Sequence, residues 1–309
     1  MSAPLLFQPS PDAIYGFPNA RRLASVDSPY QRIEVWHTPQ LGRLFTLDGR
    51  PMTSAGDEFI YHECMVHPAA LAHASPRAAL VLGGGDGGAA RQLLKHPGIE
   101  RIVVAELDAE VVRLTRAYLP DVHGGAFDDP RVELVIGDAA HYVAATAQAA
   151  AESAGVPGRP PAPASASAQF DLVVFDLTPP DSPAAGLYTP DFYAQLKRVM
   201  SPTAALSVHL GSPYFHAQRI AGLLDGLRDA FAVVRTMCTF IPLYGSLWMM
   251  ATASDTLDPA ALTVEALAER VAARRIDSLE HYDPALHAGL FSASRSVRDK
   301  LSQFLKPSS

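Results

Sequence analysis

The sequence predicts an α/β protein with a doubly wound, largely parallel sheet, preceded by a small N-terminal antiparallel β domain. From residue 78 onward, short apolar runs alternate with segments of helical periodicity, which is the pattern of repeated β-α units. The first of these runs ends in VLGGGDGG at residues 81–88, which reads as a strand, a tight glycine turn and the start of a helix. We expect two domains, at residues 1–55 and 56–309.

The N-terminal residues alternate between apolar and polar side chains, as strands with one buried face do. Strands are expected at Arg22–Val26, Gln31–His37 and Arg43–Leu47, separated by the turn sequences DSP, PQLG and DG. Residues 57–73 follow with apolar side chains at helical spacing. These segments predict a small antiparallel sheet and then one helix.

The larger sheet is predicted from a regular succession of elements. Strands are expected at Ala79–Leu82, Ile102–Glu106, Val132–Ile136, Leu172–Phe175 and Ala204–His209, helices at residues 89–95, 109–118, 139–147, 190–199 and 216–231, and a closing hairpin at Val233–Phe240 and Ser246–Ala253. Residues 147–168 are rich in Ala, Pro, Ser and Gly and offer little to bury, so we interpret them as a flexible surface insertion. The tail from Ala260 is expected to be helical and carries no recognisable chemistry.

Composition excludes several classes of protein. The chain is 48% hydrophobic and 18% charged, which is typical of a globular enzyme. Its formal charge of −7 and the absence of a dense Lys/Arg cluster argue against nucleic acid as a partner. Cys64 and Cys238 show no CxxC spacing, and neither a leader nor an apolar run near membrane-spanning length is present. We expect a cytoplasmic protein with small-molecule substrates, no metal site and no membrane partner.

Asp86 is the unusual member of the glycine-rich segment. A strand, glycine turn and helix normally offer bare backbone amides to a phosphate group. A carboxylate at that position would repel a pyrophosphate and favours a cationic group, which argues against a dehydrogenase.

Further acidic residues follow the next strands of the predicted sheet. Glu106 stands where ribose hydroxyls are commonly bound, although a solvated Glu106 beside a helix-capping Asp108 is the structural alternative. Asp138 suits either a ligand contact or an N-cap for the helix that follows it. Asp176 precedes a proline-rich loop, where it suits either a site residue or an Asx turn. Since ligands bind at the carboxyl ends of strands in open α/β sheets, we expect these residues to converge.

Together these segments resemble the polyamine aminopropyltransferases, the spermidine and spermine synthase family. The resemblance runs from about Ser28 to Ala253 and rests on Tyr30-Gln31, GDEFIYHE, GGGDGGAARQLLKHP, AELD, IGDA, FDLVVFDLTPP and LYTPDFY. It implies a Rossmann-like sheet of the class I methyltransferase type and a homodimer or homotetramer. It also implies transfer of the aminopropyl group of decarboxylated S-adenosylmethionine to an amine, with release of methylthioadenosine and without a permanently bound cofactor.

The resemblance also implies roles for individual residues. Asp86 would bind the donor's amine, and Asp176 would act as general base with Tyr61 orienting the acceptor. The other donor-binding residues would be Gln31, Gly83, Gly85, Glu106, Asp138 and Ala139, and the other acceptor-binding residues His62, Asp181, His209 and Tyr244. The chemistry is consistent, because the donor has two cationic groups and no carboxylate, and the attacking amine must lose a proton.

The sequence departs from the family pattern at the acceptor loop. Pro179 stands where the family usually has a second aspartate, and we expect Asp181 to reach the same space. His209 replaces a common glutamine, and Gly211 replaces an acidic residue. We therefore expect an acceptor that is not putrescine. Two alternatives stay open at this point, an S-adenosylmethionine-dependent methyltransferase and a non-catalytic ligand-binding relative.

Overall fold

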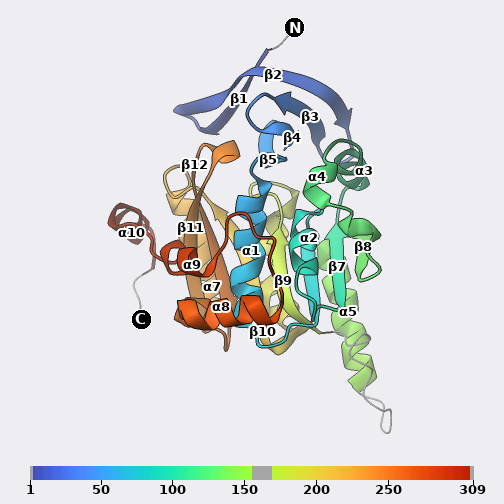
Figure 1. The fold of residues 1–309 in the computed structure, drawn as a ribbon, viewed down its shortest axis with the longest axis vertical. Coiled ribbons are helices and arrows are strands. Elements are labelled where there is room, and N and C mark those ends of the chain that lie inside the picture. Colours follow the sequence, from blue (N-terminus) through green and yellow to red (C-terminus); the bar gives the residue numbers. More distant parts are fainter. Residues whose placement is uncertain (1–2, 155–168, 307–309) are drawn as a thin grey trace.

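The computed structural model describes residues 3–154 and 169–306, which form two sheets with helices packed on both faces of the larger one. The smaller sheet lies above the carboxyl ends of the larger sheet's parallel strands, and the chain passes between them through the central helix α1 (Figure 1). The predicted fold class is confirmed. The division into domains at residue 55 stays a prediction.

The N-terminal sheet is larger than the three strands expected from the sequence. It has five antiparallel strands in chain order: β1 (Ala3–Ser10), β2 (Ala13–Asp27), β3 (Arg32–Thr38), β4 (Gly42–Leu47) and β5 (Arg50–Ser54). The first hairpin pairs Phe7 with Tyr15 across a turn at Pro11-Asp12. The burial of side chains along β2 alternates only weakly, because one face of the strand is exposed. This weak alternation explains why the sequence pattern did not reveal the hairpin.

The main sheet has seven strands in the order β11-β12-β10-β9-β6-β7-β8. Their bounds are β6 (Ala78–Gly83), β7 (Arg101–Glu106), β8 (Val132–Ile136), β9 (Phe170–Asp176), β10 (Met200–Gly211), β11 (Val233–Ile241) and β12 (Ser246–Ser254). The strands β8, β7, β6, β9 and β10 run parallel, and β12 and β11 add the antiparallel hairpin expected from the sequence. The parallel strands therefore end at one edge, next to the N-terminal sheet.

Helices cover both faces of the main sheet. They are α1 (Glu58–Ala72), α2 (Gly88–Leu94), α3 (Ala109–Tyr118), α4 (Pro120–His123), α5 (Ala139–Ala154), α6 (Pro190–Lys197), α7 (Ala217–Ala230), α8 (Val264–Ala273), α9 (Pro284–Leu290) and α10 (Arg295–Ser302). Successive strand residues point to opposite faces, so Val81 packs with α1 and α2 while Leu80 packs with α6 and α7. The N-terminal sheet packs on α3 through Ile33 and Phe45.

Helix α5 is longer than the sequence analysis expected. It continues to Ala154, through alanine-rich residues that were assigned to the insertion, because alanine has the highest helix propensity of all residues. Residues 155–168 of the expected insertion lie outside the described residues.

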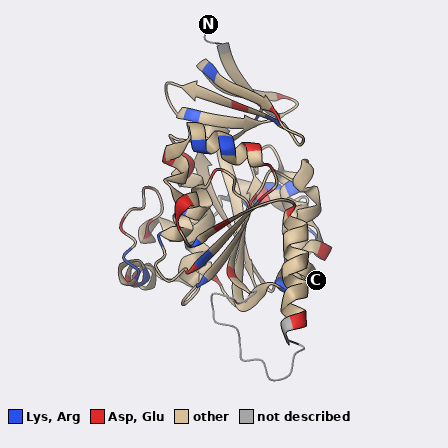
Figure 2. Cartoon of the chain, turned by 90° about the vertical axis from the view of Figure 1, so that its right-hand side faces the viewer, with Lys and Arg blue, Asp and Glu red and all other residues tan. Residues whose placement is uncertain are grey.

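Among the described residues, none of the helices combines the length and apolarity needed to cross a bilayer. Acidic and basic residues are interspersed on the face that Figure 2 presents, rather than gathered into a basic stripe.

Candidate active site

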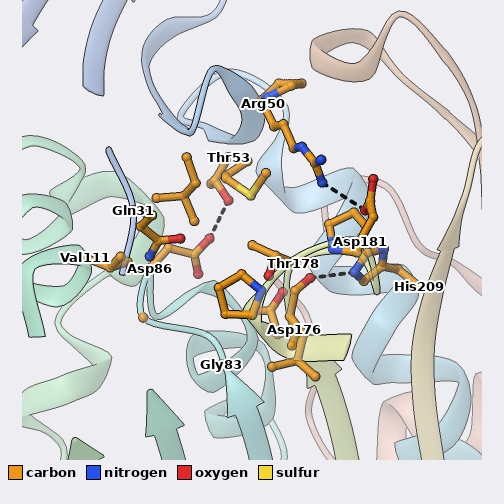
Figure 3. Close-up of a pocket in the computed structure, with 18 of the residues that line it drawn as sticks. Gln31, Arg50, Thr53, Gly83, Asp86, Val111, Asp176, Thr178, Asp181 and His209 are labelled. Carbon is orange, nitrogen blue, oxygen red and sulfur yellow. Dashed lines mark hydrogen bonds and ion pairs between the residues drawn. The ribbon is translucent and has the colours of Figure 1, made fainter. Parts of the chain in front are cut away.

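A cavity of about 460 Å³ lies where the main sheet's strand ends meet the N-terminal sheet. Its walls come from the loops after β6, β7, β8 and β9, and from β5 on the opposite side. The sequence-predicted residues among its lining are Gln31, Tyr61, Gly83, Gly85, Asp86, Glu106, Asp138, Ala139, Asp176, Asp181, His209 and Tyr244. The strand ends thus bring together nearly all of the expected site residues (Figure 3).

The glycine turn holds the ends of β6 and β9 together. Gly83 adopts a left-handed φ of 77°, and a Cβ atom there would lie 2.2 Å from the backbone oxygen of Asp176. The amide of Gly84 donates a hydrogen bond to that same oxygen at 3.0 Å. The glycine turn therefore positions Asp176 beside Asp86 at the floor of the cavity.

Asp86 is a buried, fully ionised carboxylate. Its Oδ1 accepts a hydrogen bond from the amide of Gly88 at 2.9 Å, and its Oδ2 accepts one from the hydroxyl of Thr53. Burial alone would raise the pKa of Asp86, but the nearby charge of His62 and these hydrogen bonds bring it to about 2. A negative charge is thus available to a cation in the cavity.

His62 lies behind the cavity wall rather than in it. Its Nδ1 is 2.6 Å from Glu58, and its Nε2 is 3.5 Å from Asp86 Oδ2 and 3.7 Å from Asp176 Oδ2. Burial would lower the pKa of His62, but Asp86 and the other carboxylates raise it well above its ordinary value. His62 is absent from the lining of this cavity and supplies a buried positive charge beside the two carboxylates, so the lining does not support the expected substrate contact, which stays a prediction.

The same three side chains are close enough for a metal ion to be considered. One ligand atom from each of His62, Asp86 and Asp176 lies within 4.8 Å of the others. However, a protonated imidazole has no free lone pair for a metal, and the raised pKa of His62 keeps it protonated. The cluster is better described as an ion-paired support for the two carboxylates.

Glu106 is buried beneath the glycine turn, so the solvated alternative is wrong. Its two oxygens accept hydrogen bonds from the amides of Gly85 at 3.0 Å and Asp108 at 2.8 Å. Burial raises the pKa of Glu106 to about 7, although both amides oppose the shift. Asp108 does cap α3, accepting from the Glu110 amide, and it also accepts from the side chain of Gln31 at 3.1 Å.

Asp138 is in a position that allows both of the functions that the sequence left open. Its Oδ1 accepts a hydrogen bond from the Ala140 amide at 2.8 Å at the start of α5. Asp138 and Ala139 also line the cavity, next to Glu106. One residue therefore both caps the helix and faces the ligand space.

Asp176 faces the space between the two ends of the cavity. Its Oδ2 is buried and has no hydrogen-bond partner among the described residues. Burial raises the pKa of Tyr61 well above its ordinary value, and the adjacent charge of Asp176 raises it further, so the phenol stays neutral. This carboxylate oxygen accepts no hydrogen bond from the residues that the structure describes, although it lies 3.7 Å from His62 Nε2, and it can accept a proton from a ligand.

The far end of the cavity differs from what the sequence analysis expected. Asp181 accepts a hydrogen bond from Arg50 Nη1 at 2.9 Å and lies 3.6 Å from Arg219 Nη1. Figure 3 shows Asp181 and Asp86 on opposite sides of Asp176. Asp181 therefore lines the cavity but is already paired with two guanidinium groups, and its contact with the acceptor's amine stays a prediction.

Two aromatic residues complete this end. His209 Nε2 donates a hydrogen bond to the Leu177 carbonyl at 2.6 Å, and burial lowers the pKa of His209 to about 4. Tyr244 donates a hydrogen bond to the Met52 carbonyl at 2.7 Å and packs against Trp248 at a ring separation of 4.3 Å. Both are neutral walls of the cavity.

Sequence reasoning missed three lining residues with clear partners: Thr53, Arg50 and Arg219. Thr53 and Arg50 lie in β5, which was not among the strands expected, and Arg219 lies in α7. Nothing in their spacing indicated a site.

The fold and this site define an α/β protein whose strand-end cavity is lined by several acidic side chains. A family model described as the spermine/spermidine synthase domain matches residues 58–262. The chain belongs to this family, and it is a transferase.

The similar proteins cover nearly the whole chain. The polyamine aminopropyltransferase of Nitrosomonas europaea is 42% identical over 95% of this chain and 84% of its own length. That of Sulfurisphaera tokodaii is 32% identical over 94% of this chain and 91% of its own. Two solved structures of spermidine synthases are also similar. One, in complex with the transition state analogue AdoDATO, has a TM-score of 0.81 at 27% identity and covers 94% of this chain and 92% of its own. The other, from Thermotoga maritima, has a TM-score of 0.80 at 28% identity and covers 94% of this chain and 91% of its own.

Proposed function

We propose that this protein transfers the aminopropyl group of decarboxylated S-adenosylmethionine to a primary amine and releases methylthioadenosine. The observation that carries the proposal is the placement of a buried carboxylate, Asp86, beside a partly buried one, Asp176, on one cavity floor. Asp86 has hydrogen-bond partners that keep it charged, and Asp176 has an oxygen that accepts no hydrogen bond among the described residues and can take a proton.

The donor would occupy the cavity from the glycine turn to Asp138. Its adenosyl group would lie along Glu106, Asp138 and Ala139, and its ammonium group would pair with Asp86. The geometry supports this orientation, because Asp86 is separated from Glu106 only by the glycine turn. Decarboxylated S-adenosylmethionine has no carboxylate, so it does not place an anion against Asp86.

The reaction would be a direct displacement. The acceptor's nitrogen, once deprotonated, attacks the propyl carbon next to the sulfonium. A carbon–nitrogen bond forms, the carbon–sulfur bond breaks, and its electron pair neutralises the sulfur of methylthioadenosine. Asp176 takes the proton, and Tyr61 orients the nitrogen. Alignment of two bound reactants can supply up to about 7–11 kcal/mol of the rate enhancement.

Family membership argues against the methyltransferase and non-catalytic alternatives. An Asp176→Asn variant tests the catalytic assignment most simply. We expect turnover to fall by about 10²–10⁴-fold while the dissociation constant of the decarboxylated donor changes little. Asp299→Asn, at an exposed position on α10, is the matched control. Full activity of Asp176→Asn would exclude Asp176 as the base.

Assembly into a homodimer or homotetramer remains a prediction. Light scattering of the purified chain tests it.

A further inference from the structure

The far end of the cavity carries net positive charge. Among the described residues that line the cavity, the two with a permanent positive charge, Arg50 and Arg219, both lie at Asp181. His209 and His216, which also line this end, are neutral at physiological pH because burial lowers the pKa of each to about 4. Two guanidinium groups against one carboxylate leave one positive charge in excess.

Arg219 is only partly satisfied by Asp181. Its Nη1 lies 3.6 Å from Asp181, which is an ion pair of long separation, and its Nε is buried without an acceptor among the described residues. The Arg219 side chain is 22% exposed, so water solvates little of it. An incompletely paired, largely buried guanidinium is costly unless a ligand supplies an anion.

Gly211 creates the space that Arg219 occupies. It adopts a φ of 109° at the end of β10, and a Cβ atom there would lie 2.6 Å from Arg219 Nη2. Any side chain at this position would therefore displace the guanidinium. Gly211 and Arg219 are therefore coupled, because the guanidinium occupies space that a side chain at residue 211 would fill.

A diamine such as putrescine fits this end poorly. With one amine at Asp176, its second ammonium would face Arg50 and Arg219, and the one nearby anion, Asp181, is already paired with both. Pro179, in the loop that also carries Asp181, supplies no charge. A carboxylate placed here would instead meet two guanidinium groups, which bind carboxylates in a bidentate manner.

We propose that the acceptor is a primary amine whose other end carries a carboxylate. The inference rests on the proposed aminopropyl transfer and specifies its second substrate. The amine nitrogen attacks the donor's propyl carbon and loses its proton to Asp176, the sulfur leaves with the bonding pair, and the carboxylate stays bound at Arg219 and Arg50. The product is an N-(3-aminopropyl) amino acid.

Matched pairs of acceptors provide the test. Purified full-length protein is incubated with decarboxylated S-adenosylmethionine and either putrescine or 4-aminobutanoate, and then with cadaverine or 5-aminopentanoate. Release of methylthioadenosine and the mass of the amine product are both measured. We expect the amino acid of each pair to have the higher kcat/KM.

Variants connect the preference to the arginines. In Arg219→Gln, we expect kcat/KM for the preferred amino acid to fall by about 10–100-fold, mainly through KM, while that for the diamine rises. Arg219→Lys should retain part of the preference. Arg235→Gln is the control, because it removes an arginine of β11 that is paired with Asp258, and it should change neither kcat/KM value.

The outcomes separate the two proposals. Methylthioadenosine release with diamines alone, in wild type and Arg219→Gln equally, would overturn the carboxylate site and leave aminopropyl transfer standing. No methylthioadenosine release with any acceptor of either type would contradict the proposed function itself.

Discussion

His62 Nε2 lies 3.5 Å from Asp86 Oδ2 and 3.7 Å from Asp176 Oδ2, so one ring nitrogen approaches both carboxylates. The imidazole is 1% exposed and is anchored on its other nitrogen by Glu58. A buried cation thus lies beside both the group proposed to bind the donor and the group proposed to deprotonate the acceptor. The charge of His62 offsets the cost of burying Asp86.

Replacement of His62 by glutamine removes the positive charge but keeps a polar side chain of similar size. Without the imidazolium, only the hydrogen bonds from Thr53 and Gly88 oppose the effect of burial, so the pKa of Asp86 rises in the variant. As the pH is lowered, the variant should then lose affinity for the cationic donor at a higher pH than the wild type does, since the pKa of Asp86 in the wild type is about 2. We also expect the free energy of unfolding to fall by about 3–5 kcal/mol. Calorimetric titration with decarboxylated donor from pH 4 to 8 measures the first effect, and an unshifted affinity profile would contradict it.

The Asp86→Asn variant should lose affinity for the donor but not for the product. In the proposed complex the donor's ammonium pairs with Asp86, and loss of a charge-assisted hydrogen bond of about 1.5–3 kcal/mol would weaken donor binding by about 10–100-fold. Methylthioadenosine lacks the aminopropyl group, so its dissociation constant should stay close to that of the wild type. Equal losses for both ligands would indicate general damage to the pocket rather than the proposed contact.

Gly88 is expected to be intolerant of a side chain. A Cβ atom at this position would lie 2.2 Å from Cε1 of His62, inside a cluster that cannot move without breaking its ion pairs. We expect Gly88→Ala to lower the free energy of unfolding by about 1–3 kcal/mol. The control is Gly222→Ala on α7, where nothing lies within 4 Å, and a gain of about 0.5–1 kcal/mol is expected there. Denaturant unfolding of the two variants decides between these outcomes.

The strand-end residues were predictable because local sequence specifies them. Apolar runs mark where β6, β7, β8 and β9 end, and parallel strands end at a common edge, so Asp86, Glu106, Asp138 and Asp176 had to converge. The two possible functions of Asp138 could not be separated beforehand, since capping and ligand contact use the same position.

The supporting residues were not predictable from local patterns. Arg50 and Arg219 meet Asp181 from β5 and α7, elements brought together only by the packing of the two sheets. The position of His62 behind the cavity wall depends on α1 being buried on all sides, which removes the amphipathic pattern that would indicate an inward face. Charge partners of Asp181 and His62 lie far away in the sequence, so local patterns did not reveal them.

Glu106 should make stability depend on pH near neutrality. Its pKa is about 7 in the folded protein, against 4.5 when unperturbed, so the folded state holds a proton that the unfolded state releases. The resulting contribution is fully present below pH 4.5 and is lost as pH rises through 7, by about 3 kcal/mol. As the pH rises from 4.5 to 7.5, the free energy of unfolding of the wild type should therefore fall relative to that of Glu106→Gln. Glu133→Gln, at an exposed position on β8, serves as control, and a constant difference for Glu106→Gln would exclude the raised pKa.

The most direct test of the central claim is the identity of the two products formed by the wild-type protein. Decarboxylated S-adenosylmethionine and S-adenosylmethionine are each supplied with the panel of diamines and amino acids, and the products are identified by mass spectrometry. We predict methylthioadenosine and an acceptor enlarged by one aminopropyl group, from the decarboxylated donor alone. Formation of a methylated acceptor and S-adenosylhomocysteine from S-adenosylmethionine, with no product from the decarboxylated donor, would contradict aminopropyl transfer.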